Sequence, residues 1–257
     1  MLLILAIAFL LCLLAAIVGS LRLGWWWGRR RLRLLGDHAN DGLGTLDAAV
    51  FGMMGLLLAF TFTGAAGRFE DRRHLITAEV NAIGTAWLRL DIVPEPTRGE
   101  VRELFRQYLD GRIAGYRNPD LLQARKQVDE ITNRLQAEIW AQLMTAVRDS
   151  PSLPIPVAVL PSVNEFFDLA TTRALATEQH PPRAIYGMLI MMVLVSGFLA
   201  GFGQAKAARQ SLLHVAGFAV TTTLALYLIV DLEYPRAGLV RVGDFDQALV
   251  DLRASMN

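Results

Sequence analysis

The chain has 257 residues, of which 53% are hydrophobic and 19% charged, and its formal net charge is +1. Its mean hydropathy is +0.36. The charged fraction is lower than the roughly 25% of ordinary soluble domains, so the chain is unusually apolar. Because the net charge is close to zero, the chain has no overall positive potential that would attract nucleic acid, and we expect no nucleic-acid partner. The single cysteine, Cys12, lies in an apolar run and cannot form an intrachain disulfide.

Four stretches are apolar enough to cross a membrane as helices, since a hydrocarbon core of about 30 Å needs roughly 20 apolar residues. They are residues 1–21, 48–66, 184–202 and 212–230, and none contains Asp, Glu, Lys or Arg. The first stretch could instead be a cleaved signal peptide. Such peptides usually begin with a basic segment, whereas this run is apolar from residue 1, so we expect a retained helix.

The sequence therefore predicts an all-α integral membrane protein with four transmembrane helices and a helical extramembrane domain between spans two and three. The expected parts are a first transmembrane helix (1–21), an Arg/Trp-rich loop (22–44), a second transmembrane helix (45–67), the helical extramembrane domain (68–183), the third and fourth transmembrane helices (184–230) and a C-terminal tail that packs on the helical domain (231–257).

The short loops between spans carry the evidence for orientation. Three tryptophans at 25–27 are typical of a membrane interface, and five arginines surround them: Arg22, Arg29, Arg30, Arg31 and Arg33. The loop before the fourth span carries Lys206 and Arg209. Positive residues in short loops favour the cytoplasmic side, which would place the helical domain outside.

The segment between spans two and three is predicted to be helical. Thr97 and Glu100 form a capping-box pattern before an amphipathic run. Asn118 followed by Pro119 predicts the start of a second, longer helix. Four prolines within 150–161 predict a linker, because proline lacks the backbone donor of a helix interior, and a further helix is expected over 163–178.

Residues that could carry chemistry do not form a catalytic pattern. No P-loop, HExxH, CxxC or GxSxG motif occurs, so we expect neither an enzyme nor a cofactor. The histidines, His38, His74, His180 and His214, are scattered, and we interpret each as a capping, packing or interfacial residue rather than a metal ligand. Glu70 and Asp71 point about 100° apart on a helix near three arginines, which favours ion pairing over a catalytic pair.

Two rows of residues at helical spacing, which we call stripes, run along the second span. Small residues recur every four positions at Gly55, Ala59, Thr63 and Gly67, as Gly197 and Gly201 do in the third span. Small residues at this spacing let helices pack closely in lipid. The neighbouring stripe, Gly52, Leu56 and Phe60, lies about 60° away and could form a hydrophobic constriction if several copies surround an axis. The alternative is that this stripe faces lipid or a neighbouring helix.

The stretch over residues 51–86 resembles the second transmembrane helix of bestrophins and its continuation. It is still more similar to the bacterial bestrophin-like family of membrane proteins, through AFTFTGAAGRFEDRR followed by NAIGTA. Two weaker similarities support this: Arg173 with residues 180–182 before the third span, and the acidic segment 231–238 after the fourth. The resemblance covers residues 45–257.

Bestrophins are pentameric, mostly anion-selective channels, so the resemblance implies a homo-oligomer, a pentamer, in a lipid bilayer (the bacterial inner membrane) that passes small inorganic ions such as chloride. It places the pore neck at Gly52, Leu56 and Phe60. Arg68, Arg72 and Arg73 would stand near a pore mouth and raise the local anion concentration. Gly52 departs from the bulky family neck, and Phe69 and Glu70 replace family tryptophans. Bestrophins hold the helical domain in the cytosol, opposite to the orientation that the arginines favour, so both orientations stay open.

Two other functions remain. The chain could be a non-conducting membrane scaffold or sensor that binds a partner through its helical domain. A transporter usually shows internal repeats or paired intramembrane charges. The spans contain neither, and Asp47 and Asp231 stand at span ends, where we expect their carboxylates to reach water.

Overall fold

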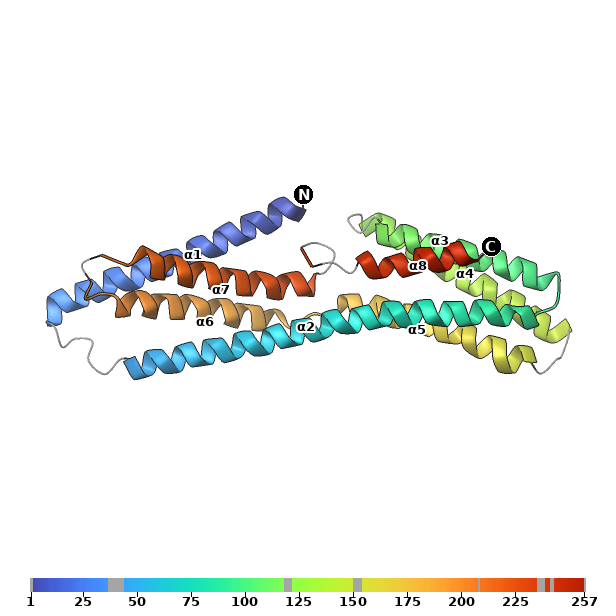
Figure 1. Cartoon of the computed structure of the whole chain (residues 1–257), viewed down its shortest axis with the longest axis horizontal. Helices are drawn as coiled ribbons and strands as arrows, with labels where there is room; N and C mark the ends of the chain where they lie inside the picture. Colours follow the sequence, from blue (N-terminus) through green and yellow to red (C-terminus); the bar gives the residue numbers. More distant parts are fainter. Residues whose placement is uncertain are drawn as a thin grey trace. The chain divides into compact units, whose positions relative to one another are not determined.

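The computed structural model describes residues 2–36, 44–117, 122–149, 154–207, 209–234, 239–240 and 243–256. Every regular element in these ranges is a helix, which confirms the predicted all-α class (Figure 1). The chain divides into two compact units. We call Met1–Phe69 with His180–Val240 the membrane unit, and Glu70–Gln179 with Arg241–Asn257 the polar unit.

Four helical stretches are long and apolar enough to cross a membrane: Ile7–Leu35, Gly44–Ile92, Ile155–Gly203 and Leu212–Glu233. Their apolar parts lie in α1 (Leu2–Leu35), α2 (Gly44–Arg89), α6 (Arg183–Gly203) and α7 (Leu212–Glu233). The four predicted spans are therefore confirmed as long apolar helices.

The membrane unit is built around the packing of α1 against α6 and α7 (Figure 1). Its buried core takes side chains from all three helices: Leu13, Ile17, Leu21, Leu189, Val193, Val215, Ala219 and Leu226. The hydroxyl of Ser20 on α1 donates a 2.6 Å hydrogen bond to the carbonyl oxygen of Leu194 on α6. In α7, the hydroxyl of Thr221 donates a 2.7 Å hydrogen bond back to the carbonyl oxygen of Gly217, so it is satisfied within its own helix.

Helices α1 and α6 meet backbone to backbone through glycines. A Cβ atom on Gly201 would lie 1.9 Å from the carbonyl oxygen of Leu21, and one on Gly24 would lie 1.9 Å from that of Phe198. Both distances are far inside van der Waals contact, so only glycine fits at these two positions. The small residues of the third span thus lie directly against the first helix.

Helix α1 does not end where its apolar run ends. It continues to Leu35, so residues 22–35, which we expected in a loop, are helical. The reason is that no proline interrupts this stretch, and its glycines face α6: a Cβ on Gly28 would lie 3.0 Å from the carbonyl oxygen of Phe202. The Arg/Trp-rich segment is therefore a rigid extension of a transmembrane helix.

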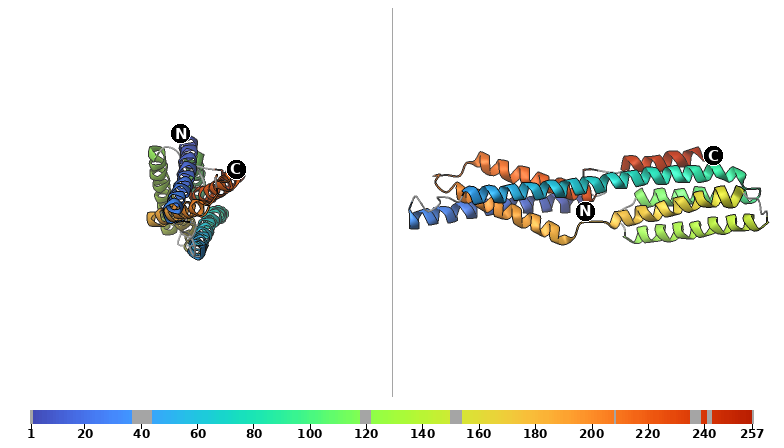
Figure 2. Two further views of the ribbon diagram at one scale, coloured as in Figure 1. Left: turned by 90° about the vertical axis from the view of Figure 1, so that its left-hand side faces the viewer. Right: turned by 90° about the horizontal axis from the view of Figure 1, so that it is seen from below.

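The polar unit consists of the C-terminal part of α2 and a series of shorter helices. In chain order these are η1 (Leu90–Ile92), α3 (Thr97–Arg117), α4 (Leu122–Asp149), η2 (Ile155–Val159), α5 (Leu160–Glu178) and α8 (Gly243–Ser255). Helix α3 packs beside α4 and also contacts α8 (Figure 2). The predicted helix start at Asn118 and Pro119 lies outside the described residues.

An aromatic cluster forms the centre of the polar unit. The ring of Phe166 on α5 meets Phe105 and Tyr108 of α3 at centroid distances of 5.2 and 5.4 Å. All three side chains are fully buried, together with Ile83 of α2 and Leu249 of α8. Burial raises the pKa of the Tyr108 hydroxyl to about 12. The C-terminal helix therefore contributes directly to this core.

The proline-rich stretch is helical from residue 154 onward, which corrects the predicted linker over 150–161. Ile155–Val159 forms one π-helical turn that leads directly into α5, and Ile155 and Val159 are buried in the polar core. Prolines are tolerated here because they fall in the first turns, whose N–H groups need no helical acceptor. The apolar residues between them then provide the packing.

The start of α3 is stabilised by a residue outside the predicted capping box. The carboxylate of Glu95 accepts a 3.1 Å hydrogen bond from the backbone N–H of Gly99. Hydrogen bonds from Arg98 and Gly99 lower the pKa of this carboxyl. The helix begins at Thr97, where the sequence pattern predicted it.

Candidate functional site on the second helix

The membrane part of α2 presents one apolar half to its own chain and leaves the other half exposed. Met54, Leu57 and Leu58 pack against the core of the membrane unit. Leu56 and Phe60 are 56% and 67% exposed. The helix therefore attaches to the unit by one face, and its opposite face has no covering within the described residues.

Both predicted stripes lie on this exposed face. All seven positions of the two stripes are exposed: Gly52, Gly55, Leu56, Ala59, Phe60, Thr63 and Gly67. A Cβ atom added at Gly52, Gly55 or Gly67 would meet no described atom within 4 Å. The candidate neck and the candidate packing ladder therefore face away from the rest of the membrane unit.

The contrast with the other spans is large. In the most apolar part of α2 only 6% of the residues are buried, against 22% in the first span and 33% in the third and fourth. The small residues of α6 contact α1 at backbone distance, whereas the same kind of residue on α2 has open space beside it. The glycines of the α2 ladder thus have no partner among the described residues of their own chain.

At the end of this face, Arg68 belongs to a charge cluster inside the membrane unit. Its guanidinium contacts the fully buried carboxylate of Glu233 at the end of α7, with Nε at 2.8 Å from Oε1. Nδ1 of His180 lies 3.4 Å from the other oxygen of the same carboxylate. The imidazole of His180 stacks on Tyr234 with centroids 4.6 Å apart. Glu233 thus links α2 to α7 and to the segment before α6.

The next two arginines are also engaged, within the polar unit. Arg72 is buried and donates to the carbonyl oxygens of Ala176 and Gln179, at 3.1 and 3.0 Å. These carbonyls lie at the C-terminal end of α5, where a cation satisfies free acceptors and offsets the helix dipole. Arg73 pairs with Glu70 at 2.6 Å, the ion pairing that the sequence favoured over a catalytic role.

These contacts change what the three predicted pore-mouth arginines can do. The charge of Arg68 is compensated by Glu233, that of Arg73 by Glu70, and Arg72 is directed into carbonyl groups. A compensated cation contributes less to a long-range field than a free one. Locally, Arg68 and Arg72 bind the ends of α7 and α5, and Arg73 pairs within α2.

A buried ion network in the polar unit centres on Glu79, which the sequence analysis did not identify. The carboxylate of Glu79 is fully buried on α2 and accepts bonds from Arg112 of α3 at 2.6 and 2.9 Å and from Arg173 of α5 at 2.7 Å. Arg173 also reaches Asp246 of α8 at 2.5 Å. A lone carboxylate between Ile76 and Ile83 was the available sign, because a charge at a buried helical position needs a partner.

Asp231 has a structural role that differs from our expectation. We expected its carboxylate to reach water at the end of the fourth span. It is buried instead, and it accepts hydrogen bonds from the backbone N–H groups of Leu239 and Val240 at 2.8 to 3.1 Å. Part of the similar segment, residues 235–238, lies outside the described residues.

No group of three His, Cys, Asp or Glu side chains that could hold a metal ion occurs among the described residues. His74 lies 3.3 Å from Glu70, and the His214 ring lies 2.8 Å from the Ser211 hydroxyl. His38 lies outside the described residues. These described histidines each contact a side chain three or four residues away on the same helix or at its start.

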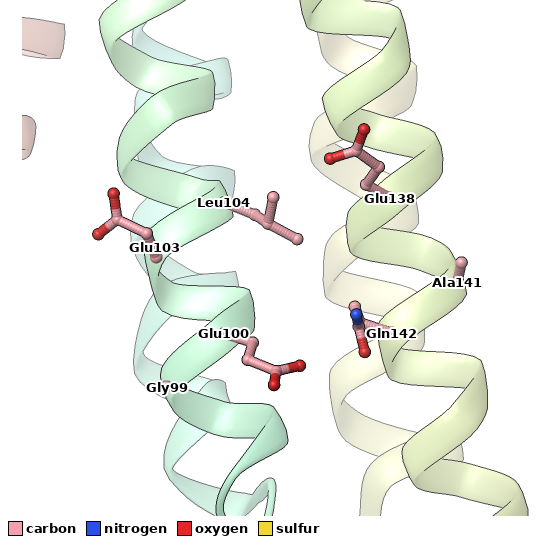
Figure 3. A pocket seen from close by; sticks show the side chains of 7 residues that line it. All are labelled: Gly99, Glu100, Glu103, Leu104, Glu138, Ala141 and Gln142. Carbon is pink, nitrogen blue, oxygen red and sulfur yellow. The ribbon is translucent and has the colours of Figure 1, made fainter.

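A wide groove of about 630 Å³ runs between α3 and α4 in the polar unit. Figure 3 shows Glu100 and Leu104 of α3 pointing toward α4, and Glu138 of α4 pointing toward α3. Arg134 lies 3.6 Å from Glu138, and hydrogen bonds from Gln107 and Arg106 lower the pKa of Glu103. The groove is therefore acidic and open to solvent, and these carboxylates interact with polar neighbours on their own helices.

The arrangement of four long apolar helices with a separate polar helical unit defines a multi-pass membrane protein of all-α class. The family model of the bestrophin-like domain matches residues 14–245. The chain therefore belongs to the bestrophin-like domain family, as the motif in the second span indicated, and this family is channel-like in character. No curated protein and no solved structure matches the chain.

Proposed function

We propose that the chain is the subunit of an oligomeric ion channel whose pore is lined by α2. The observation that carries the proposal is the exposed small-residue face of α2. Exposed Leu and Phe alone do not distinguish a pore from lipid contact. Gly and Ala positions with open space beside them are different, because they offer little surface to lipid but allow another helix to approach closely.

The packing of α6 supports this interpretation. Within the same membrane unit, Gly201 and Gly24 allow backbone contact between two helices. The ladder of Gly55, Ala59 and Gly67 provides the same possibility on α2, and a second copy of the chain would supply the partner. Several copies packed through this ladder would turn the adjoining stripe of Leu56 and Phe60 toward a common axis. A ring of such side chains can close a pore by dewetting.

We further propose that small anions, such as chloride, pass through this pore. The membrane unit carries five arginines in or next to the C-terminal part of α1, and Lys206 and Arg209 follow α6. Cations in these numbers raise the local concentration of anions and their rate of entry. The resemblance of residues 51–86 to bestrophins, which are mostly anion-selective, supports this ion class. The partners would be the lipid bilayer, identical copies of the chain, by resemblance five, and small inorganic ions.

The test is ion flux from liposomes that contain the purified full-length protein. Phe60→Ala should increase chloride efflux at least several-fold, because it shortens the hydrophobic constriction. Phe62→Ala is the matched control: Phe62 is also exposed, at 45%, but lies about 160° away around the helix. Equal flux from wild type and Phe60→Ala, or equal changes in both variants, would reject α2 as the pore lining.

The alternative is a non-conducting scaffold or sensor that binds a partner through the polar unit. The pairing of Arg68, Arg72 and Arg73 favours it, since these cations then act as structural anchors. A mass measurement of the detergent-solubilised protein separates the two proposals. A ring of four or more copies supports the channel, whereas a stable monomer or dimer supports the scaffold.

A further inference from the structure

The C-terminal part of α1 extends beyond the apolar run as a rigid, strongly basic helix. The whole helix has 34 residues, or about 51 Å at 1.5 Å per residue, whereas a hydrocarbon core spans about 30 Å. If residues 2–21 fill that core, Arg22 stands at its boundary. The following residues then enter the headgroup layer. The contacts of Gly24 and Gly28 with α6 fix this segment in place.

The basic residues of this segment are concentrated on one side. Successive residues turn by about 100°, so Arg22, Trp26, Arg29 and Arg33 fall within about 60° of one another. Gly24 and Gly28, which touch α6, lie roughly opposite. Arg22, Arg30 and Arg33 are exposed, and Trp26 is 47% exposed. We call Arg22, Trp26, Arg29, Arg30 and Arg33 the cationic face.

Aromatic rings and arginines are paired along this segment. The Cζ atom of Arg30 lies 5.7 Å from the ring centroid of Trp26, and that of Arg29 lies 4.8 Å from Trp25. These contacts hold guanidinium groups beside indole rings. Arg31 points the other way, with its Cζ 5.9 Å from the ring of Phe202 on α6.

Positive charges outnumber negative charges around the cationic face. Residues 1–36 contain no Asp or Glu. The connection after α6, held against α1 by a 3.2 Å hydrogen bond from Gln210 to the carbonyl of Leu21, adds Lys206 and Arg209. The described acidic residues of the membrane unit are Asp47, in the first turn of α2, and the buried Asp231 and Glu233 of α7, which already bind backbone N–H groups and Arg68. Asp37 and Asp41 lie outside the described residues.

We propose that the cationic face is a binding surface for the headgroups of anionic phospholipids. A guanidinium donates paired hydrogen bonds to phosphate oxygens, and basic clusters beside a transmembrane helix attract anionic lipid. The occupant is a lipid rather than a soluble anion because the face begins where the apolar run ends. A half-exposed Trp26 is also favoured at the headgroup level, where its ring meets acyl chains and its N–H meets polar groups.

The test measures lipid preference on the full-length protein in detergent, with phosphatidylglycerol and phosphatidylcholine of identical acyl chains. Native mass spectrometry counts the lipid molecules retained, and thermal unfolding reports the stabilisation. The wild type should retain phosphatidylglycerol in preference. Arg22→Gln/Arg30→Gln should lower that preference roughly 25-fold, about fivefold for each charge. Equal retention of the two lipids by the wild type would overturn the proposal.

Matched variants separate a binding role from a loss of net charge. Arg134→Gln/Arg148→Gln removes two exposed arginines of α4 in the polar unit and should leave the lipid preference unchanged. Arg22→Lys/Arg30→Lys keeps the charge and should keep most of the preference, which also covers the case where the Gln variant fails to fold. An equal loss in the α4 variant would reject the cationic face. So would stabilisation by inorganic phosphate equal to that by phosphatidylglycerol, because it would indicate a site for free anions.

Discussion

The two parts of α2 use their apolar residues in opposite ways. In the membrane unit Leu56 and Phe60 are more than half exposed, whereas in the polar unit Ile76 and Ile83 are 2% and 0% exposed. The polar part is covered by α3, α5 and α8 of the same chain, through the aromatic core and the Glu79 network. The chain thus provides its own partner for one part of the helix and not for the other.

This difference shows which exposed residues of a membrane helix indicate that a partner helix is missing. In water an exposed Phe would signal a missing partner, but in lipid it costs nothing. Exposed small residues such as Gly55 and Gly67 are the more specific sign, since they gain little from lipid. The following experiments test whether the two parts of α2 differ as described, from the largest expected effect to the smallest.

The largest effect should come from the buried charge of the polar part. Glu79→Ala leaves Arg112 and Arg173 without their shared carboxylate and should lower the free energy of unfolding by about 3–5 kcal/mol. Thermal unfolding of the full-length protein in detergent measures it. Glu70→Ala, which removes a 46%-exposed carboxylate, should cost no more than about 1 kcal/mol. Similar losses in both variants would contradict the network.

The second experiment makes equivalent truncations in the two parts of α2. Ile83→Ala should lower the free energy of unfolding by about 2–5 kcal/mol, because it opens a cavity in the polar core. Leu56→Ala should change it by only about 0.5 kcal/mol, because its side chain has little cover within the chain. Urea or thermal unfolding of both variants provides the comparison. A large loss of unfolding free energy for Leu56→Ala in the monomeric protein would show that the two parts of α2 do not differ as described.

The third experiment tests the glycine contacts that set α6 apart from α2. Gly201→Ala places a methyl group against the carbonyl of Leu21 and should cost about 1–3 kcal/mol. Gly217→Ala in α7 meets no described atom within 4 Å and should stabilise the helix by up to about 1 kcal/mol. Unfolding midpoints of the two variants should therefore move in opposite directions. A shift of the same sign in both would show that the α1–α6 contact is looser than described.

The smallest effect is a pH dependence that belongs to the polar unit. The pKa of Tyr108 is raised to about 12 by burial, above the ordinary value of 10. The unfolded chain therefore loses this proton at lower pH than the folded chain, so stability is full below pH 10 and falls as the pH rises toward 12. At pH 11 the loss should be about 1 kcal/mol. The free energy of unfolding, measured between pH 9 and 11, should show this loss. In Tyr108→Phe the part of the pH dependence that comes from Tyr108 should disappear.

Much of the architecture could be predicted from the sequence because its signals are local. A run of some 20 apolar residues is sufficient for a span, and the motif over 51–86 was sufficient to indicate the family. The stripes of α2 were equally visible, since helical spacing alone determines which residues share a face. Their exposure is the new information, and it depends on which face of α2 packs against the core.

The features that sequence analysis missed depend on contacts between distant segments. Residues 22–35 were expected in a loop because they are basic and lie between two apolar spans, and the glycine contacts with α6 that help α1 continue join distant segments. The partners of Glu79 come from α3 and α5, which no pattern around Glu79 specifies. Likewise, Arg68 was expected to act on ions, and its pairing with Glu233 joins residues 165 positions apart in sequence.

The most direct test of the account is cysteine accessibility on the exposed face of α2. In a background that replaces the exposed Cys12 with Ser, Phe60→Cys and Phe62→Cys place one thiol each on a side chain that is exposed in the single chain. A pore lined by α2 predicts that a charged, water-soluble thiol reagent modifies the cysteine at position 60 and changes ion flux. The cysteine at position 62 should stay unmodified, because it lies on the side of the packing ladder and away from the pore axis. Equal protection of both positions, or equal modification, would contradict the assignment of this face to a pore.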